Sequence, residues 1–203
     1  MKSRSRPERE RERERILNLD KELAIGEVFD LSAKTNNDDF TKSFIEKHKG
    51  NIPVYGASKD RNYVSYGYVK DNLPSIEYFE NCLTWNRDGS IGKVFFRKGR
   101  FCLSKNVFPL IVRNDYKILL DEIFLKYTLE KELAKYNFDF TNKASKGRIK
   151  DIKIKIPLNS QGNFDLAKQQ EVAKKYQQIE EIKEKIKIDL EKIENTKIKI
   201  DLE

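Results

Sequence analysis

The sequence predicts an α+β fold in which a curved sheet of mixed or antiparallel strands, with flanking helices, precedes a long C-terminal coiled-coil helix. Two observations predict it. Between residues 21 and 157, short apolar runs bounded by Gly, Asn and Pro outnumber helical patterns. After that segment an apolar residue recurs at every seventh position, at Val172, Ile179, Ile186, Ile193 and Ile200. That spacing is typical of a coiled-coil seam.

The first 20 residues are expected to form a charged arm. Residues 7–15 are a proline followed by alternating Glu and Arg. On a helix this alternation places like charges four residues apart and opposite charges three apart, so the pair effects partly cancel. Because the segment has no apolar face, it is expected to be solvated rather than packed.

The globular segment, residues 21–157, contains the predicted sheet. We expect a first strand over residues 24–30 and a short helix over 40–49 that ends at Gly50. Further strands are expected at residues 52–55, 63–69, 75–84, 92–96, 101–103 and 108–112. Residues 117–136 have the apolar spacing of an amphipathic helix. The isoleucines at 152, 154 and 156 alternate with lysines, which predicts a strand with one buried face that Pro157 ends.

The last segment, residues 164–203, is expected to be one helix with Asp165 as its N-cap. Its apolar stripe is predicted to contact a partner helix through Val172, Ile179, Ile182, Ile186, Leu190, Ile193 and Ile200. From Val172 to Ile200 the seam spans about 42 Å at about 1.5 Å per residue, which exceeds the diameter of a small domain. We therefore favour pairing with another chain or subunit over packing on the protein's own domain.

The positive charge is concentrated in the globular segment. The whole chain has a formal charge of +8, of which residues 1–20 contribute +2, residues 164–203 contribute −1 and residues 21–163 contribute +7. Excess positive charge on a folded domain is typical of proteins that bind a phosphate backbone. The alternative is a charge that only keeps the protein in solution.

Several other classes are disfavoured by the composition. No apolar stretch approaches the roughly 20 residues of a membrane helix, and Met1 is followed by charged residues rather than by a signal segment. Cys82 and Cys102 fit neither a metal cluster nor a disulfide scaffold, and are expected to be small core residues. A reducing cytoplasm is the expected location.

Three polar loops supply side chains suited to contacting nucleic acid. Loop 1 is residues 58–63, loop 2 is 85–92 and loop 3 is 141–148. Arginine and asparagine pair with base edges, whereas lysine and serine suit phosphates. The candidate contacts are Lys59, Arg61, Asn62, Asn86, Arg87, Ser90, Lys143, Lys146 and Arg148. Each loop could instead be an ordinary polar loop, and Trp85 could stack on a base, although a core position is commoner.

Three other functions compare differently with the residues. An adenine methyltransferase is disfavoured because residues 51–55 lack the second proline of the catalytic motif, and no Gly-rich cofactor loop follows a strand. A metal-dependent nuclease could use Asp139 with Asp151 and Lys153, but the last two lie in a charge-alternating strand whose exposed positions are expected to be ionic. A protein-binding scaffold without a role on DNA fits the heptad helix equally well.

An ordered set of segments resembles the specificity subunit of type I restriction-modification systems. Residues 50–56 are similar to the early strand of a target-recognition domain, and residues 84–94 contain its Gly-Ser-Ile-Gly turn. Residues 106–110 follow at the usual place. Residues 146–157, followed by Gln170-Glu171-Val172, resemble the junction between recognition domain and spacer helix. The resemblance covers about residues 22–195, and the order of the segments is more specific than any single motif.

The resemblance implies a non-catalytic specificity component that reads one half of a bipartite target in double-stranded DNA. Residues 1–20 would be the arm, 21–157 the target-recognition domain, and 164–203 the spacer and dimerisation helix, with no cofactor or metal. Implied partners are DNA methyltransferase (modification) subunits and a restriction subunit. A full-length member has two recognition domains and two spacer helices, whereas this chain has room for one of each. It therefore resembles a half subunit that forms a homodimer, or a segment of a fused enzyme.

Overall fold

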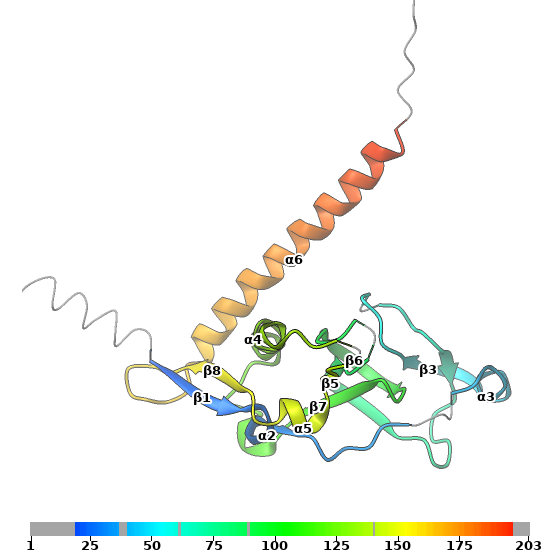
Figure 1. Ribbon diagram of the computed structural model, residues 1–203, viewed down its shortest axis with the longest axis horizontal. Coiled ribbons are helices and arrows are strands. Elements are labelled where there is room, and N and C mark those ends of the chain that lie inside the picture. Colours follow the sequence, from blue (N-terminus) through cyan, green and yellow to red (C-terminus); the bar gives the residue numbers. More distant parts are fainter. Residues whose placement is uncertain (1–18, 37–39, 61, 89, 140, 197–203) are drawn as a thin grey trace, which may run out of the picture.

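The computed structural model of the chain describes residues 19–36, 40–60, 62–88, 90–139 and 141–196. Most of the predicted arm, together with Arg61 and Ile200, lies outside these ranges. Figure 1 shows a globular head, from which a long helix projects. The predicted α+β class is confirmed.

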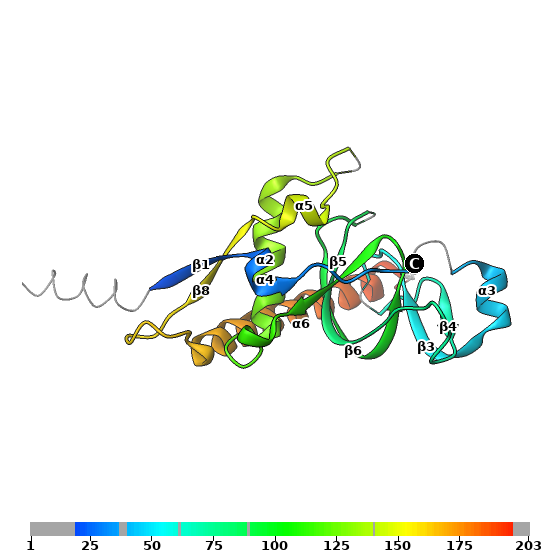
Figure 2. The same cartoon turned by 90° about the horizontal axis from the view of Figure 1, so that it is seen from below.

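A six-stranded mixed sheet forms the head, in the strand order β2-β7-β5-β6-β3-β4. Its strands are β2 (Phe29–Asp30), β3 (Lys49–Tyr55), β4 (Gly67–Val69), β5 (Tyr78–Asn86), β6 (Val94–Leu103) and β7 (Val107–Val112). Among the described strands of this sheet, β3 and β6 pair in parallel and the other neighbours are antiparallel. The β5–β6 register shifts between Glu80 and Cys82, with Asn81 at φ 44°. Such a bulge bends the strand, as the curved β5–β6 pair in Figure 2 shows.

A second sheet joins the two ends of the globular segment. Strand β1 (Asp20–Ala24) pairs antiparallel with β8 (Lys153–Pro157). The expected first strand over residues 24–30 is wrong, because a helical turn, α2 (Ile25–Val28), separates β1 from β2. Ile25 and Val28 are both fully buried and lie three apart, which suits a helix rather than a strand. The Ile25 amide donates to the Ile152 carbonyl (2.9 Å), which anchors this turn.

Three other differences concern how elements divide. The strands expected at 92–96 and 101–103 are one strand, β6, because its polar middle stays paired with β5. The helix expected over residues 117–136 is shorter: α4 spans Glu122–Leu133, and the Asp121 carboxylate caps its first turn. A 3-10 turn, η1 (Asn114–Tyr116), precedes it, and another, η2 (Ala134–Tyr136), follows it. A short helix, α5 (Lys146–Ile149), was not expected, whereas the expected helix near residue 45 is α3 (Lys42–Lys47).

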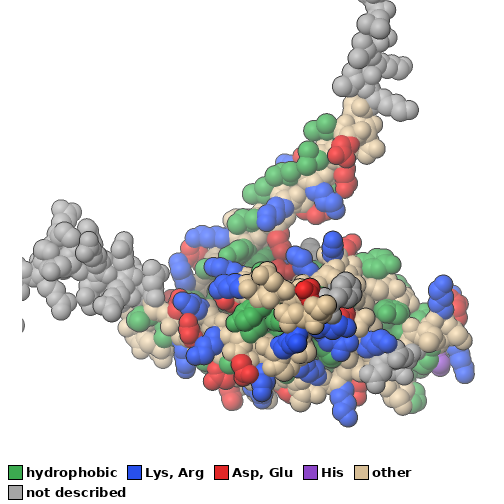
Figure 3. Space-filling model, viewed as in Figure 1, with side chains coloured by type: hydrophobic (Ala, Val, Ile, Leu, Met, Phe, Trp, Pro, Cys, Tyr) green, Lys and Arg blue, Asp and Glu red, His purple; other side chains and the backbone are tan. Residues whose placement is uncertain are grey.

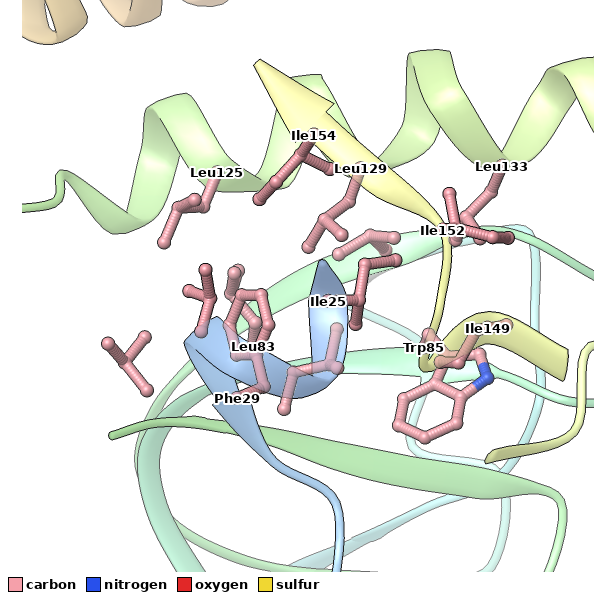
Figure 4. Close-up of a cluster of buried hydrophobic side chains, with 14 of the residues drawn as sticks. Ile25, Phe29, Leu83, Trp85, Leu125, Leu129, Leu133, Ile149, Ile152 and Ile154 are labelled. Carbon is pink, nitrogen blue, oxygen red and sulfur yellow. The ribbon is translucent and has the colours of Figure 1, made fainter. Parts of the chain in front are cut away.

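The main core lies between the sheet, α2, α4 and β8. Figure 4 shows Leu125, Leu129 and Leu133 of α4 facing the sheet, with Ile154 of β8 beside them. Trp85 is fully buried here, and its indole N–H donates to the Ala144 carbonyl (3.0 Å). Trp85 therefore belongs to the core and is not a stacking platform.

The long C-terminal helix is α6 (Leu166–Glu194), and the predicted N-cap is confirmed because the Asp165 carboxylate accepts from the Lys168 amide (2.9 Å). Its first turns pack on α4, where Ala173 is buried and Val172 lies against the main core. Val172 is thus half-buried against the head, and its predicted contact with a partner helix stays a prediction. Beyond this contact α6 leaves the head, as Figure 1 shows.

The projecting part of α6 carries an uncovered apolar face. Its exposed fractions are 46% at Ile179, 58% at Ile182, 54% at Ile186, 54% at Leu190 and 69% at Ile193. Figure 3 shows hydrophobic side chains following one another along the projecting helix. Helix propensity alone contributes little stability to an isolated helix, so we expect this apolar face to be buried against another molecule. Among the described residues, no helix combines the length and apolar content that crossing a membrane requires.

Candidate nucleic-acid interface

The structure brings the three predicted loops onto one surface at one end of the sheet. The Asn86 amide of loop 2 donates to the Ser58 carbonyl of loop 1 (2.9 Å). The Lys143 ammonium of loop 3 lies 2.9 Å from a carboxylate oxygen of Asp88 in loop 2. Figure 2 shows the turn after β5 and the segment before α5 on the same side of the molecule. These contacts make a single candidate interface from segments 28 to 85 residues apart in sequence.

Loop 2 is a tight turn, as its sequence predicts. The Gly92 amide donates to the Asn86 carbonyl (3.2 Å), and the Lys93 amide donates to the Ser90 carbonyl (3.3 Å). Gly92 has φ +81°, which glycine adopts without strain, and Ser90 has φ 44°, which is uncommon for a residue with a side chain. Ser90 itself is half-buried at the turn.

Asn86 does not reach the surface, so the prediction that it contacts a base is wrong. Its side chain is fully buried, and its amide group donates to the carbonyls of Ser58 and, at 3.4 Å, Ser90. Its side-chain oxygen is buried with no hydrogen-bond partner among the described residues. Asn86 therefore holds loop 1 against loop 2.

Asp88 organises the cations of the interface. Its side chain is only 12% exposed, and its carboxylate accepts from the Arg87 guanidinium (3.2 Å) and faces Lys143 on its other oxygen. Burial raises the pKa of Asp88, but the hydrogen bond from Lys143 and the charges of Lys143 and Arg87 outweigh it and leave the pKa below its usual range. The acid is thus ionised at neutral pH and positions both cations.

Arg87 and Lys143 keep part of their side chains accessible. The Arg87 guanidinium lies over the Phe108 ring (5.3 Å to the centroid) and also donates to the Asn106 side chain (3.4 Å), with 31% of the side chain exposed. Lys143 is 46% exposed. An ammonium has three donors and a guanidinium five, so each retains hydrogen-bonding capacity toward a ligand.

The two cations of α5 have different surroundings. The Lys146 ammonium donates to the Ala33 carbonyl (2.5 Å) and lies over the Phe108 ring, so its side chain braces the fold. Burial lowers the pKa of Lys146, and Asp30 partly offsets this. Arg148 is exposed and donates to the Asn142 side chain (2.5 Å) and the Lys143 carbonyl (3.3 Å), which stiffens loop 3.

Loop 1 presents its polar groups to solvent. Lys59 and Asn62 are both exposed, and the Asn62 amide donates to the Asp60 carboxylate (2.8 Å), which fixes the local turn. Tyr63 follows with 57% of its surface exposed. Sequence reasoning did not include Tyr63 among the candidate contacts.

The turn between β6 and β7 was also missed. The Arg87 amide donates to the Asn106 carbonyl (2.9 Å), so this turn lies directly beside loop 2. The antiparallel pairing of Asn86 with Val107 places the start of β7 at the end of β5. A prediction of that pairing would have identified Asn106.

The residues considered for a nuclease are not gathered into a site. Asp139 accepts from the Thr141 and Asn142 amides in its own turn, which lowers its pKa. Asp151 lies on the surface with 82% of its side chain exposed. Within the described ranges, no three His, Cys, Asp or Glu side chains are arranged to hold a metal ion.

Comparisons with known proteins point to one family. A family model described as the type I restriction modification DNA specificity domain matches residues 20–199. The specificity subunit of the type I restriction enzyme MpnII from Mycoplasma pneumoniae is 33% identical over 119 residues, which are 58% of this chain and 34% of that protein. Another sequence from that organism, assigned as a type I specificity subunit, is 34% identical over 119 residues, or 47% of its length. The chain thus spans less than half of these relatives.

Solved structures share the fold. The S subunit of a type I restriction-modification system from M. genitalium superposes with a TM-score of 0.55 at 17% identity, covering 81% of this chain and 40% of that one. A chain from a study of complex assembly and conformational transition in a type I system gives 0.62 at 15% identity, covering 86% and 42%. At these identities the likeness concerns the fold, including the long C-terminal helix.

Proposed function

Since the chain belongs to the family of type I restriction modification DNA specificity domains, we propose that its head reads one half of a bipartite target in double-stranded DNA. The observation that carries the proposal is the joining of three cation-bearing loops into one surface by Asn86, Asp88 and Trp85. Sequence is read by contacts to base edges, and a surface built from three loops offers such contacts at several points.

Phosphate contacts bring the head onto the duplex. Residues 21–163 carry a formal charge of +7, and the exposed Lys59, Lys143 and Arg148 place part of it on the candidate interface. Such cations release counterions from DNA when they bind, so affinity falls steeply with salt. The Ser90 hydroxyl also suits a phosphate contact.

Base contacts then come from Arg87 and Asn62, with Arg61 as a further candidate. Arginine pairs bidentately with guanine and asparagine with adenine in the major groove. The Arg87 guanidinium is already oriented by Asp88, Asn106 and Phe108, which reduces the ordering cost of binding. Asn86 and Lys146 support these contacts from behind.

The uncovered face of α6 is the proposed site of pairing between two copies of the chain. We call α6 the stalk. A two-fold axis between two stalks would relate two identical heads, so the target would be an interrupted palindrome with a gap fixed by the helices. The same helices are proposed to dock DNA methyltransferase subunits, and through them a restriction subunit. In this arrangement the chain performs no catalytic step.

Two alternatives differ in the pairing and in the DNA. The chain could be the specificity segment of a fused restriction-modification enzyme, in which case a second recognition domain would make the target asymmetric. It could also be a coiled-coil scaffold without a role on DNA. The apolar face of α6 is the feature that supports this alternative.

Duplex binding at a series of salt concentrations tests the proposal. The full chain should bind DNA with an affinity that falls by orders of magnitude between about 50 and 200 mM salt. Lys59→Gln should weaken binding to all sequences alike and reduce the salt slope by about one unit. Lys185→Gln, an equal change of charge on the exposed stalk, is the matched control and should leave both unchanged.

Sequence discrimination separates the base contacts from the phosphate contacts. Arg87→Gln should reduce the preference for the target half-site by about 1–3 kcal/mol while nonspecific affinity falls less. Binding that is absent, or that depends equally on Lys59 and Lys185, would favour the scaffold.

A further inference from the structure

A polar cluster between α4 and α6 joins the stalk to the head. The Lys126 ammonium lies 2.6 Å from one carboxylate oxygen of Glu180 on α6, and the Tyr127 hydroxyl donates to the other oxygen (2.8 Å). Lys126 is buried, with 7% of its surface exposed. The Tyr127 ring also stacks on Tyr176 of α6, with centroids 4.9 Å apart and planes inclined by 18°. Lys126, Tyr127, Tyr176 and Glu180 are called the stalk clamp below.

Burying a cation between two helices costs desolvation free energy. The side chain of Lys126 is 8% exposed and that of Glu180 is 43% exposed, so the desolvation cost falls mainly on the ammonium. That cost offsets part of the attraction, and apolar residues of similar size often stabilise a fold as well or better. The pair does, however, supply direction. Apolar contact is non-directional, whereas a carboxylate whose two oxygens are bound from adjacent residues of α4 fits one orientation.

A second directional contact lies at the start of the stalk. Gln169 is fully buried; its amide donates to the Leu119 carbonyl (3.1 Å), and its oxygen accepts from the Asp121 amide (2.9 Å). Gln169 and Glu180 are about 16 Å apart along the helix at about 1.5 Å per residue. Two directional anchors on one rigid helix define the angle between stalk and head.

We infer that the stalk clamp determines which gap between half-sites is accepted, by holding the stalk at one angle to the head. This inference rests on the proposed function. The stalk extends about 20 Å from Glu180 to Ile193. Over that length a freedom of about 10° at the clamp displaces the far end by about 3.5 Å, close to the rise of one base pair. Base readout in the loops would be untouched.

The double variant Lys126→Met with Glu180→Leu removes the directional pair and keeps the contact apolar. Its matched control is Lys175→Met with Glu171→Leu, which removes an exposed ion pair (2.6 Å) of the same helix. Full chains are offered duplexes with two copies of the half-site separated by every gap length within one helical turn. Wild type and control should enrich one gap. The clamp variant should accept three gap lengths: the wild-type gap and the gaps one base pair shorter and longer. Their enrichments should lie within about threefold of each other, and the half-site sequence should be unchanged.

A distance measurement reads the angle without DNA. Spin labels at Lys98→Cys on the head and Lys185→Cys on the stalk should give a narrow distribution of distances in the wild-type background and a broader one in the clamp variant. If the double variant loses cooperative unfolding, Tyr127→Phe, which removes only one hydroxyl, replaces it and should show the same broadening to a smaller extent.

The outcomes separate the two claims. A clamp variant that keeps a single gap, or keeps the narrow distance distribution, overturns the inference while the proposed function stands. A wild type that enriches no gap removes the proposed function, and the inference with it.

Discussion

Polar substitution of the uncovered stalk face should separate the two copies of the chain. Ile186 and Ile193 leave 54% and 69% of their surface exposed, and full burial of such a side chain stabilises by about 1.5–3 kcal/mol. Covering the exposed part in a pair therefore contributes about 1–2 kcal/mol per side chain. Since both copies carry both changes, Ile186→Asn with Ile193→Asn should weaken the pair by about 4–8 kcal/mol, or at least roughly a thousandfold in Kd.

Sedimentation equilibrium of the full chain over a range of concentrations measures this Kd. Glu184→Asn with Glu191→Asn is the matched control, because these positions have the same spacing on the opposite side of the helix and the same new residue. Near-ultraviolet circular dichroism of the buried Trp85 checks that the head stays folded. A wild type that is monomeric throughout, or an equal effect of both double variants, would refute the reasoning.

Other predictions concern the head. Asp88→Asn should lower Tm at neutral pH. The folded-state pKa of Asp88 is below its usual 3.8, so the ionised carboxylate stabilises the fold at pH values above 3.8. The difference in Tm from wild type should disappear as the pH falls through the folded-state pKa. Asn86→Ala removes the side-chain donor of the Ser58 carbonyl and one of the two donors of the Ser90 carbonyl, which keeps the Lys93 amide. It should reduce the free energy of unfolding in urea by about 1–3 kcal/mol, whereas no loss would contradict its bracing role. Burial raises the pKa of Cys82 and Cys102 to about 12, so neither should react with a thiol reagent at pH 8 until urea unfolds the chain; rapid reaction of the native protein would contradict this.

The sheet and the long helix could be predicted because their signals are local. Alternating isoleucines marked β8, Pro157 marked its end, and Asp165 marked the start of α6. These patterns depend on residues within a few positions of one another. The turn α2 was missed since its reason is tertiary: the Ile25 amide is bound by the Ile152 carbonyl, more than a hundred residues away.

The candidate interface was predictable in its segments but not in its side chains. Sequence alone placed polar groups in loops 1 to 3, and Asn86 looked the same as Asn62. Only the fold shows that Asn86 faces the Ser58 carbonyl inside the head, while Asn62 stays exposed. The stalk clamp was equally invisible, because Lys126 and Glu180 meet only where α6 crosses α4.

Selection from a pool of randomised duplexes tests the central claim most directly. The full chain, incubated with the pool at moderate salt, should enrich an interrupted palindrome whose halves match in inverted orientation and whose gap has one length. Sequencing of the bound fraction gives both the half-site and the gap. An unenriched pool would contradict DNA reading by the head, and a single asymmetric site would contradict reading by two identical copies.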